Sequence, residues 1–205
     1  EWTEELKELD GRLDCYWSFH LWAGPAVVLK QSPPVRLVGT VEHDMDGRMS
    51  WCVIDILDHG QVLLANVYGP AAHELREQFF VECRQIIKRS MIKRHCEQLI
   101  VAGDFNCVLN PAFDRQLVST KGECGHRNLS ALMMELELID AWPELMPNMH
   151  GFTWSPTSYM IKRGEAEERR ELPEEWTDSD VQGDKIRRAG MARLDRWLVS
   201  LNILT

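Results

Sequence analysis

The first third of the chain alternates short apolar runs with turn-forming residues. Runs of branched or aromatic side chains bounded by Gly, Pro, Asn or Asp are typical of β-strands. Strands are therefore predicted over Gly24–Leu29, Val35–Val41, Met49–Leu57 and Gln61–Tyr68. The turn signals Asp44–Arg48 and Asp58–Gly60 separate the last three of these runs. Because strands joined by short turns pair antiparallel, this block is predicted to form a β-meander.

The middle of the chain changes to a helical period. Within Ala71–Cys96, apolar side chains recur at helical spacing with charged residues between them, namely Leu75, Phe79, Cys83, Ile86 and Ile87. This spacing predicts one long amphipathic helix, and a shorter helix is predicted over Arg127–Leu138. Apolar runs predict further strands over Gln98–Gly103, Phe152–Ser155 and Arg193–Ser200. The segment 156–192 carries both charge signs without a period and is predicted to be a solvated loop.

A meander followed by helices that alternate with strands predicts an α/β fold, a mixed sandwich with helices outside the sheets. The 205 residues suffice for one substantial core, and a single domain over residues 1–205 is predicted. The six cysteines show no C-x-x-C pair and indicate reduced thiols of an intracellular protein, nuclear or cytoplasmic. No apolar run has the length needed to cross a bilayer, so no membrane partner is expected.

The charge balance narrows the function classes. A formal net charge of −9 argues against a protein that coats nucleic acid, because such affinity comes from Lys and Arg that neutralise phosphates. The same net charge is compatible with an enzyme that binds nucleic acid at one local site, or with one that recruits divalent cations.

The most informative stretch for chemistry is Leu99–Asn106, an apolar run that ends in Gly-Asp-Phe-Asn. It is predicted to be a buried strand, and open α/β sheets usually place ligand sites at the carboxyl ends of such strands. In extended backbone, Asp104 and Asn106 share one face while Phe105 points inward. A carboxylate and an amide side by side could hold a metal, a water or a phosphate.

Four short motifs follow one another along the chain: Asn66–Pro70, Gly103–Asn106, Gly151–Ser155 and Arg193–Ser200. In this order they resemble the endonuclease/exonuclease/phosphatase superfamily, whose members are α/β sandwiches that hydrolyse phosphate esters with Mg²⁺. Within it the chain most resembles the endonuclease domains of LINE-type (non-LTR) retrotransposons, on the pair Asp114-Arg115 and the stretch Leu138–Trp142. Apurinic/apyrimidinic endonucleases are more distant relatives.

The resemblance implies direct roles for three side chains. Asp104 would orient or deprotonate the attacking water, and Asn106 would hold this water or a phosphate oxygen. Both would help to bind Mg²⁺, for which Mn²⁺ could substitute. Tyr68 would donate a hydrogen bond to the phosphate. Plainer interpretations exist, since Asp and Asn often form turns after strands and a strand-end Tyr often keeps its hydroxyl in water.

Three further residues receive supporting roles from the resemblance. Asp195 would orient a catalytic histidine, while Thr153 would touch the DNA backbone and Arg193 is expected to contact DNA. The alternatives are again structural. Thr is favoured in strands by propensity, and an Arg-x-Asp pair at the start of a strand commonly forms a surface ion pair worth about 0–1 kcal/mol.

Two parts of the family pattern are missing from the sequence. Family members open with a strand that carries an active-site Asn and then a Glu that is the main Mg²⁺ ligand, for which Glu1 is a poor substitute. They close with Ser-Asp-His, whereas this chain stops at Thr205. We therefore expect a four-layer α/β sandwich, two mixed β-sheets flanked by helices, without its first and last strands, and weak or no activity of this chain alone.

The sequence thus predicts a Mg²⁺-dependent, DNA-nicking endonuclease of the retrotransposon type, with DNA as its partner. A downstream reverse transcriptase domain in a longer parent protein is left open. Two alternatives remain. One is a non-catalytic remnant or binding module, and the other is a phosphatase or lipid phosphodiesterase of the same superfamily.

Overall fold

A computed structural model describes residues 13–17, 26–30, 35–115, 126–154 and 191–204 of the chain. Most strands lie in the first half, at β1 (Leu13–Trp17), β2 (Ala26–Lys30), β3 (Val35–His43), β4 (Met49–Ile56), β5 (Gly60–Tyr68) and β6 (Gln98–Asp104). The long helix α2 (His73–Arg94) lies between β5 and β6 in the sequence. After β6 follow α3 (Pro111–Asp114), α4 (His126–Glu135), β7 (Leu138–Asp140), α5 (Ala141–Leu145), β8 (Asp195–Ser200) and the 3₁₀ turn η1 (Leu201–Ile203).

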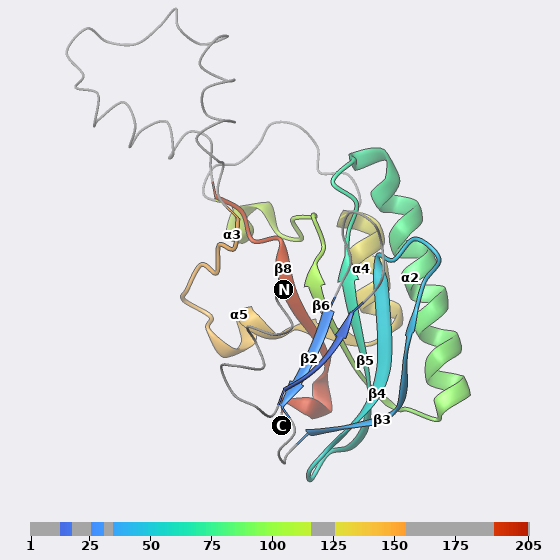
Figure 1. Cartoon of the computed structure of the whole chain (residues 1–205). Helices are drawn as coiled ribbons and strands as arrows, with labels where there is room; N and C mark the ends of the chain where they lie inside the picture. Colours follow the sequence, from blue (N-terminus) through green and yellow to red (C-terminus); the bar gives the residue numbers. More distant parts are fainter. Residues whose placement is uncertain (1–12, 18–25, 31–34, 116–125, 155–190, 205) are drawn as a thin grey trace, which may run out of the picture.

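Six of these strands form one mixed sheet in the order β3-β4-β5-β6-β8-β7. Strands β5 and β6 are parallel, with α2 as the crossover between them, and all other neighbouring pairs are antiparallel. Strands β1 and β2 form a separate antiparallel pair. Figure 1 shows this pair lying across the six-stranded sheet, with α2 and α4 on the opposite side.

The two faces of the sheet carry two apolar cores. On the helix side, Phe80, Ile87 and Leu132 pack against strand residues such as Leu63 and Val101. Each of these five is at most 1% exposed, and full burial of a side chain of this size stabilises the fold by about 1.5–3 kcal/mol. Strand residues that point to the other face form a second core with Val27 of β2. The sheet is therefore covered on both faces, as a sandwich requires.

The predicted α/β class with a mixed sheet is confirmed, and so are the two predicted helices, found as α2 and α4. The predicted meander is confirmed for β3, β4 and β5. Its first predicted strand, found as β2, instead pairs with β1 in the separate sheet. The turn before β5 is also confirmed, with Asp58 at φ 69° and Gly60 at φ 77°. The described part of the second sheet is a two-stranded antiparallel pair rather than a mixed sheet. The absence of the first and last strands, and the single domain over 1–205, stay predictions.

Two local predictions were wrong. The helix predicted to reach Leu138 ends at Glu135, and Leu138–Asp140 is strand β7. The chain reverses at Glu137, whose φ is 53°, and three residues are then held extended only by pairing with β8. The strand predicted over Phe152–Ser155 is not formed in its described part, where a single bridge joins Trp154 to Ala192.

The loop predicted over 156–192 lies outside the described residues apart from its last two positions. Among the helices that the structure describes, none combines the length and apolar character needed to span a bilayer.

Candidate active site

Three polar side chains form a row across the carboxyl-terminal ends of β5 and β6 and the start of β8. Tyr68 lies directly opposite Asp104 in the parallel β5–β6 pair. Asp104 lies directly opposite Asp195 in the antiparallel β6–β8 pair. Since opposed residues of neighbouring strands share a face, the three side chains project from the same face of the sheet, the one that faces β1 and β2. The structure thus brings together three of the predicted site residues.

Two glycines allow the strands to approach closely at this row. A Cβ at Gly103, whose φ is 130°, would lie 2.1 Å from the carbonyl oxygen of Val67. A Cβ at Gly69 would lie 2.3 Å from the carbonyl oxygen of Phe105. Any side chain here would clash with backbone, which explains physically why glycine adjoins both Tyr68 and Asp104 in the sequence.

Asn106 joins the row through a tight turn rather than through continued strand. Its backbone N–H donates to Asp104 Oδ1 at 2.7 Å, and its φ is 46°. Asn tolerates this left-handed conformation better than most residues. Its side-chain amide donates to Gly69 O at 2.9 Å and to Asp104 Oδ2 at 3.3 Å. The prediction that the two side chains meet is correct, but the reason given, an extended backbone, was wrong. Phe105 points inward as predicted and is 1% exposed.

The Asp104 carboxyl is half-buried and its pKa lies above the usual value for an aspartate. Burial is the main cause, and the negative charge of Asp195 adds to it. The N–H of Asn106 and the positive charge of Arg76 act in the opposite direction but do not cancel the rise. A carboxylate with a raised pKa binds a proton more readily, which is what a general base at neutral pH requires.

Two arginines that the sequence reasoning missed lie beside the row. The guanidinium of Arg48 lies 5.5 Å from the centre of the Tyr68 ring and donates to Tyr68 O at 3.4 Å. The buried Arg76 donates to the carbonyl oxygens of Pro70 and Ala71 at 2.9 and 2.8 Å. Arg48 therefore holds the last residue of β5, and Arg76 holds the backbone that follows this strand. Nothing in the spacing of the sequence singled them out, because each acts through backbone carbonyls.

Thr153 is exposed and lies beside the first residues of β8. Its hydroxyl oxygen accepts hydrogen bonds from the backbone N–H groups of Leu194 and Asp195, each at 3.1 Å. The residue therefore contacts the strand that carries Asp195. Whether it also touches DNA stays a prediction.

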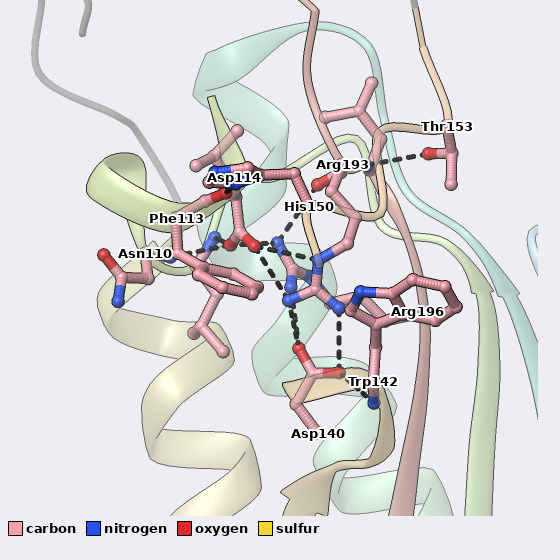
Figure 2. Close-up of polar contacts among 12 residues, drawn as sticks. Asn110, Phe113, Asp114, Asp140, Trp142, His150, Thr153, Arg193 and Arg196 are labelled. Carbon is pink, nitrogen blue, oxygen red and sulfur yellow. Dashed lines mark hydrogen bonds and ion pairs between the residues drawn. The ribbon is translucent and has the colours of Figure 1, made fainter. Parts of the chain in front are cut away.

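Behind the row lies a buried quartet of charges, Asp114, Asp140, Arg193 and Arg196, which Figure 2 shows with its dashed contacts. Arg193 donates to Asp114 at 2.8 Å and to both carboxylate oxygens of Asp140 at 2.9 and 2.6 Å. Arg196 donates to Asp140 at 2.8 Å and to Asp114 at 2.7 Å. The quartet joins the last residue of α3 to the end of β7 and the start of β8.

The position of Arg193 corrects two expectations. The side chain is buried at 3% exposure and its donors point to Asp114 and Asp140, so it offers no surface for a contact with DNA. It also does not form the surface pair with Asp195 that was its alternative interpretation. Its neighbour Arg196 is also buried, at an inward position in the alternating pattern of β8.

The quartet makes an acid-dependent contribution to stability. Burial alone raises the pKa of Asp114, but Arg196 and Arg193 outweigh it, so the pKa of this carboxyl is lowered in the folded protein. A lowered folded pKa means stabilisation that is fully present above the unfolded-state pKa of about 3.9 and is lost as the pH falls through the folded value. Urea unfolding from pH 7 to pH 3 is therefore expected to show a smaller loss of stability in Asp114→Asn than in the wild type. Parallel curves for the two proteins would contradict this.

The oxygen atoms of the side chains in this row suit a hard divalent cation as ligands. Both amide hydrogens of Asn106 are used, by Gly69 O and Asp104 Oδ2, which leaves its Oδ1 as an acceptor. Asp104 and Asp195 add two carboxylates on opposed strand positions. Oxygen ligands of this kind suit Mg²⁺, which usually binds through one or two carboxylates and keeps several waters. The described residues contain no group of three or more His, Cys, Asp and Glu arranged around one position. The two carboxylates and the amide oxygen of Asn106 thus fit part of a magnesium site rather than a complete one.

Known proteins were compared with the chain by sequence and by structure. No family model matches it, and no curated protein is significantly similar in sequence. The 3′ phosphatase NExo from Neisseria, bound to a product DNA hairpin, is similar in structure with a TM-score of 0.61 at 16% identity, over 97% of this chain and 70% of that one. The endonuclease domain of TRAS1, a telomere-specific non-LTR retrotransposon, gives 0.52 at 13% identity, over 94% and 68%.

The chain has the endonuclease/exonuclease/phosphatase fold. A truncated TDP2 from Caenorhabditis elegans shares it, with a TM-score of 0.51 at 15% identity, over 97% of this chain and 65% of that one. The fold suggested by the four motifs is thereby confirmed. The chain spans between 65% and 70% of the length of these three structures.

Proposed function

We propose that this protein hydrolyses phosphodiester bonds in DNA with the help of a divalent cation, as a nicking endonuclease of the retrotransposon type. The observation that carries the proposal is the row of Tyr68, Asp104 and Asp195 on one face of the sheet, with Asn106 bonded to Asp104. The endonuclease/exonuclease/phosphatase fold supports it, as do the names of the similar structures, which include a DNA phosphatase and a retrotransposon endonuclease.

Asp104 is the general base in this proposal. Its raised pKa and its place between two strand ends suit it to take a proton from a water that attacks phosphorus. The water oxygen forms the new P–O bond, the P–O bond to the leaving sugar oxygen breaks, and that oxygen ends protonated. Asn106 positions the water, because its own orientation is fixed by bonds to Gly69 and Asp104.

Tyr68 binds the phosphate in this proposal, and Arg48 supports Tyr68. The Tyr68 hydroxyl donates a hydrogen bond to a phosphoryl oxygen, and Arg48 packs over the ring and restricts its position. Preorganised donors of this kind stabilise the charge that develops in the transition state.

Asp104, Asn106 and Asp195 are the residues that would hold Mg²⁺ or Mn²⁺. A cation there would neutralise charge on the phosphoryl and leaving oxygens. The negative charge of Asp195 also raises the pKa of Asp104. The role first inferred for Asp195, to orient a histidine, stays a prediction. Of the described histidines, His73 bonds to Arg76 and His150 to Phe113 O rather than to Asp195.

The proposal is tested by the conversion of supercoiled plasmid to the relaxed circle, with Mg²⁺ and with EDTA. We expect relaxation only with the metal, and we expect Mn²⁺ to replace it. Folding of the sample is checked separately by a cooperative urea transition. A folded protein that leaves the plasmid supercoiled under every metal condition would refute nicking and favour the non-catalytic alternative.

A second candidate function is hydrolysis of a phosphate at a DNA 3′ end. The structural similarity to the Neisseria 3′ phosphatase favours it, because its TM-score of 0.61 exceeds those of the retrotransposon endonuclease and of TDP2. A hairpin oligonucleotide with a 3′ phosphate separates the two candidates. Release of phosphate from the hairpin without plasmid relaxation would support the phosphatase, and hydrolysis of a small phosphoester alone would point away from DNA.

A further inference from the structure

The first residues of β8 are held by hydrogen bonds on both sides of the backbone. Thr153 Oγ1 accepts from the N–H groups of Leu194 and Asp195. The carbonyl oxygen of Leu194 accepts from the N–H of Phe105 at 3.0 Å. Phe105 directly follows Asp104, so one continuous set of backbone contacts runs from Thr153 through Leu194 to the strand that carries Asp104.

The other side of the same segment is fixed by charge. Arg193 and Arg196 precede and follow Asp195, and both reach inward to Asp114 and Asp140 (Figure 2). The N–H of Arg193 also donates to Asp114 O at 2.9 Å. The quartet and Thr153 thus contact this segment from two sides, and one of the two amides bonded to Thr153 is the one that precedes the Asp195 side chain.

We propose that Thr153 is a positioning residue for Asp195, acting through its hydroxyl oxygen on the Leu194 and Asp195 amides rather than through contact with DNA. The inference rests on the proposed function for its catalytic consequence. A hydroxyl oxygen has two lone pairs, and the two amides occupy both. Asp195 is exposed, and no described residue hydrogen-bonds its carboxylate, so the direction of that carboxylate depends on the backbone that Thr153 holds.

The matched variants are Thr153→Val and Thr153→Ser. Valine keeps the size and the β-branched shape but removes the acceptor, whereas serine keeps the acceptor. In steady-state nicking we expect Thr153→Val to lower kcat by about 10²-fold, the scale of a small misplacement of a reacting group, with KM little changed. Thr153→Ser is expected to recover most of this loss. A raised KM with unchanged kcat would instead mean that Thr153 contacts DNA, and it would overturn the proposal.

A second measurement is independent of activity. Amide hydrogen exchange at Leu194 and Asp195 is expected to become faster in Thr153→Val and to return toward the wild-type rate in Thr153→Ser. Ser130→Ala is the control, because it removes a hydroxyl that bonds to His126 O on the exposed side of α4. It should change neither exchange at β8 nor kcat.

The two measurements separate the two ideas. If the wild type does not cleave DNA, the proposed function fails, and exchange alone decides on the positioning contact. Equal exchange in the wild type and Thr153→Val overturns the positioning role whatever the activity. Faster exchange without a fall in kcat, in a wild type that nicks, also overturns it.

Discussion

Asp104→Asn is expected to lower kcat for plasmid nicking by about 10²–10⁴-fold, the usual contribution of a general base. The amide has nearly the same shape, and its oxygen can still accept from the N–H of Asn106. What is lost is the ability to take a proton and the negative charge that attracts the cation. The effect should therefore appear in kcat and in the metal concentration required, with the fold unchanged.

The same variant makes a second measurement informative. The raised pKa of Asp104 means that its ionised form is less stable in the folded protein than in the unfolded chain. At pH 7 the neutral amide should give a urea midpoint no lower than that of the wild type. Such loss of activity without loss of stability is typical of functional residues.

The control for Asp104→Asn is Asp46→Asn, the same change at an exposed position in the turn before β4. It is expected to nick at the wild-type rate. Equal nicking by Asp104→Asn and Asp46→Asn would remove Asp104 from the mechanism and with it the main support for the proposed function.

Asp140→Asn is expected to reduce the free energy of unfolding by about 3–5 kcal/mol, since it leaves the buried guanidiniums of Arg193 and Arg196 with one carboxylate instead of two. Asp55→Asn is the matched control. Its partner Arg36 is 77% exposed, so this surface pair should contribute about 0–1 kcal/mol. Urea unfolding of both variants measures the difference. Losses of equal size would show that the quartet stabilises no more than an ordinary surface pair.

The sequence predicted the parts of the fold that are encoded locally. The period of α2 and the alternation of β3 to β5 arise from neighbouring residues, so both could be read directly. Strand β7 could not, because its three residues are extended only through pairing with a strand far along the chain. The bridge at Trp154 likewise depends on Ala192, and no local pattern distinguishes it from a strand.

The candidate site was predicted through the order of its motifs rather than through its geometry. Tyr68, Asp104 and Asp195 were expected to act together, and the strand register places Asp104 between the other two, opposite each of them. The contact between Asp104 and Asn106 depends on a left-handed residue that the pattern did not reveal. Arg193 was misread because its burial depends on carboxylate partners from two distant segments, Asp114 of α3 and Asp140 of β7, which no single stretch of sequence displays.

The order of the strands also bears on how this protein folds. The meander pairs residues close in sequence, whereas β6 must pair with β8 across a long separation. The hydrogen bond from Leu99 N–H to Ser200 Oγ, for example, joins positions that are 101 apart in the numbering. Loops of that length close late, because their entropy is lost before any contact is gained. The meander and α2 can therefore form while the end of the chain is still unfolded. Asp195 joins Asp104 only when β8 docks, so the candidate site is completed in the last stage of folding.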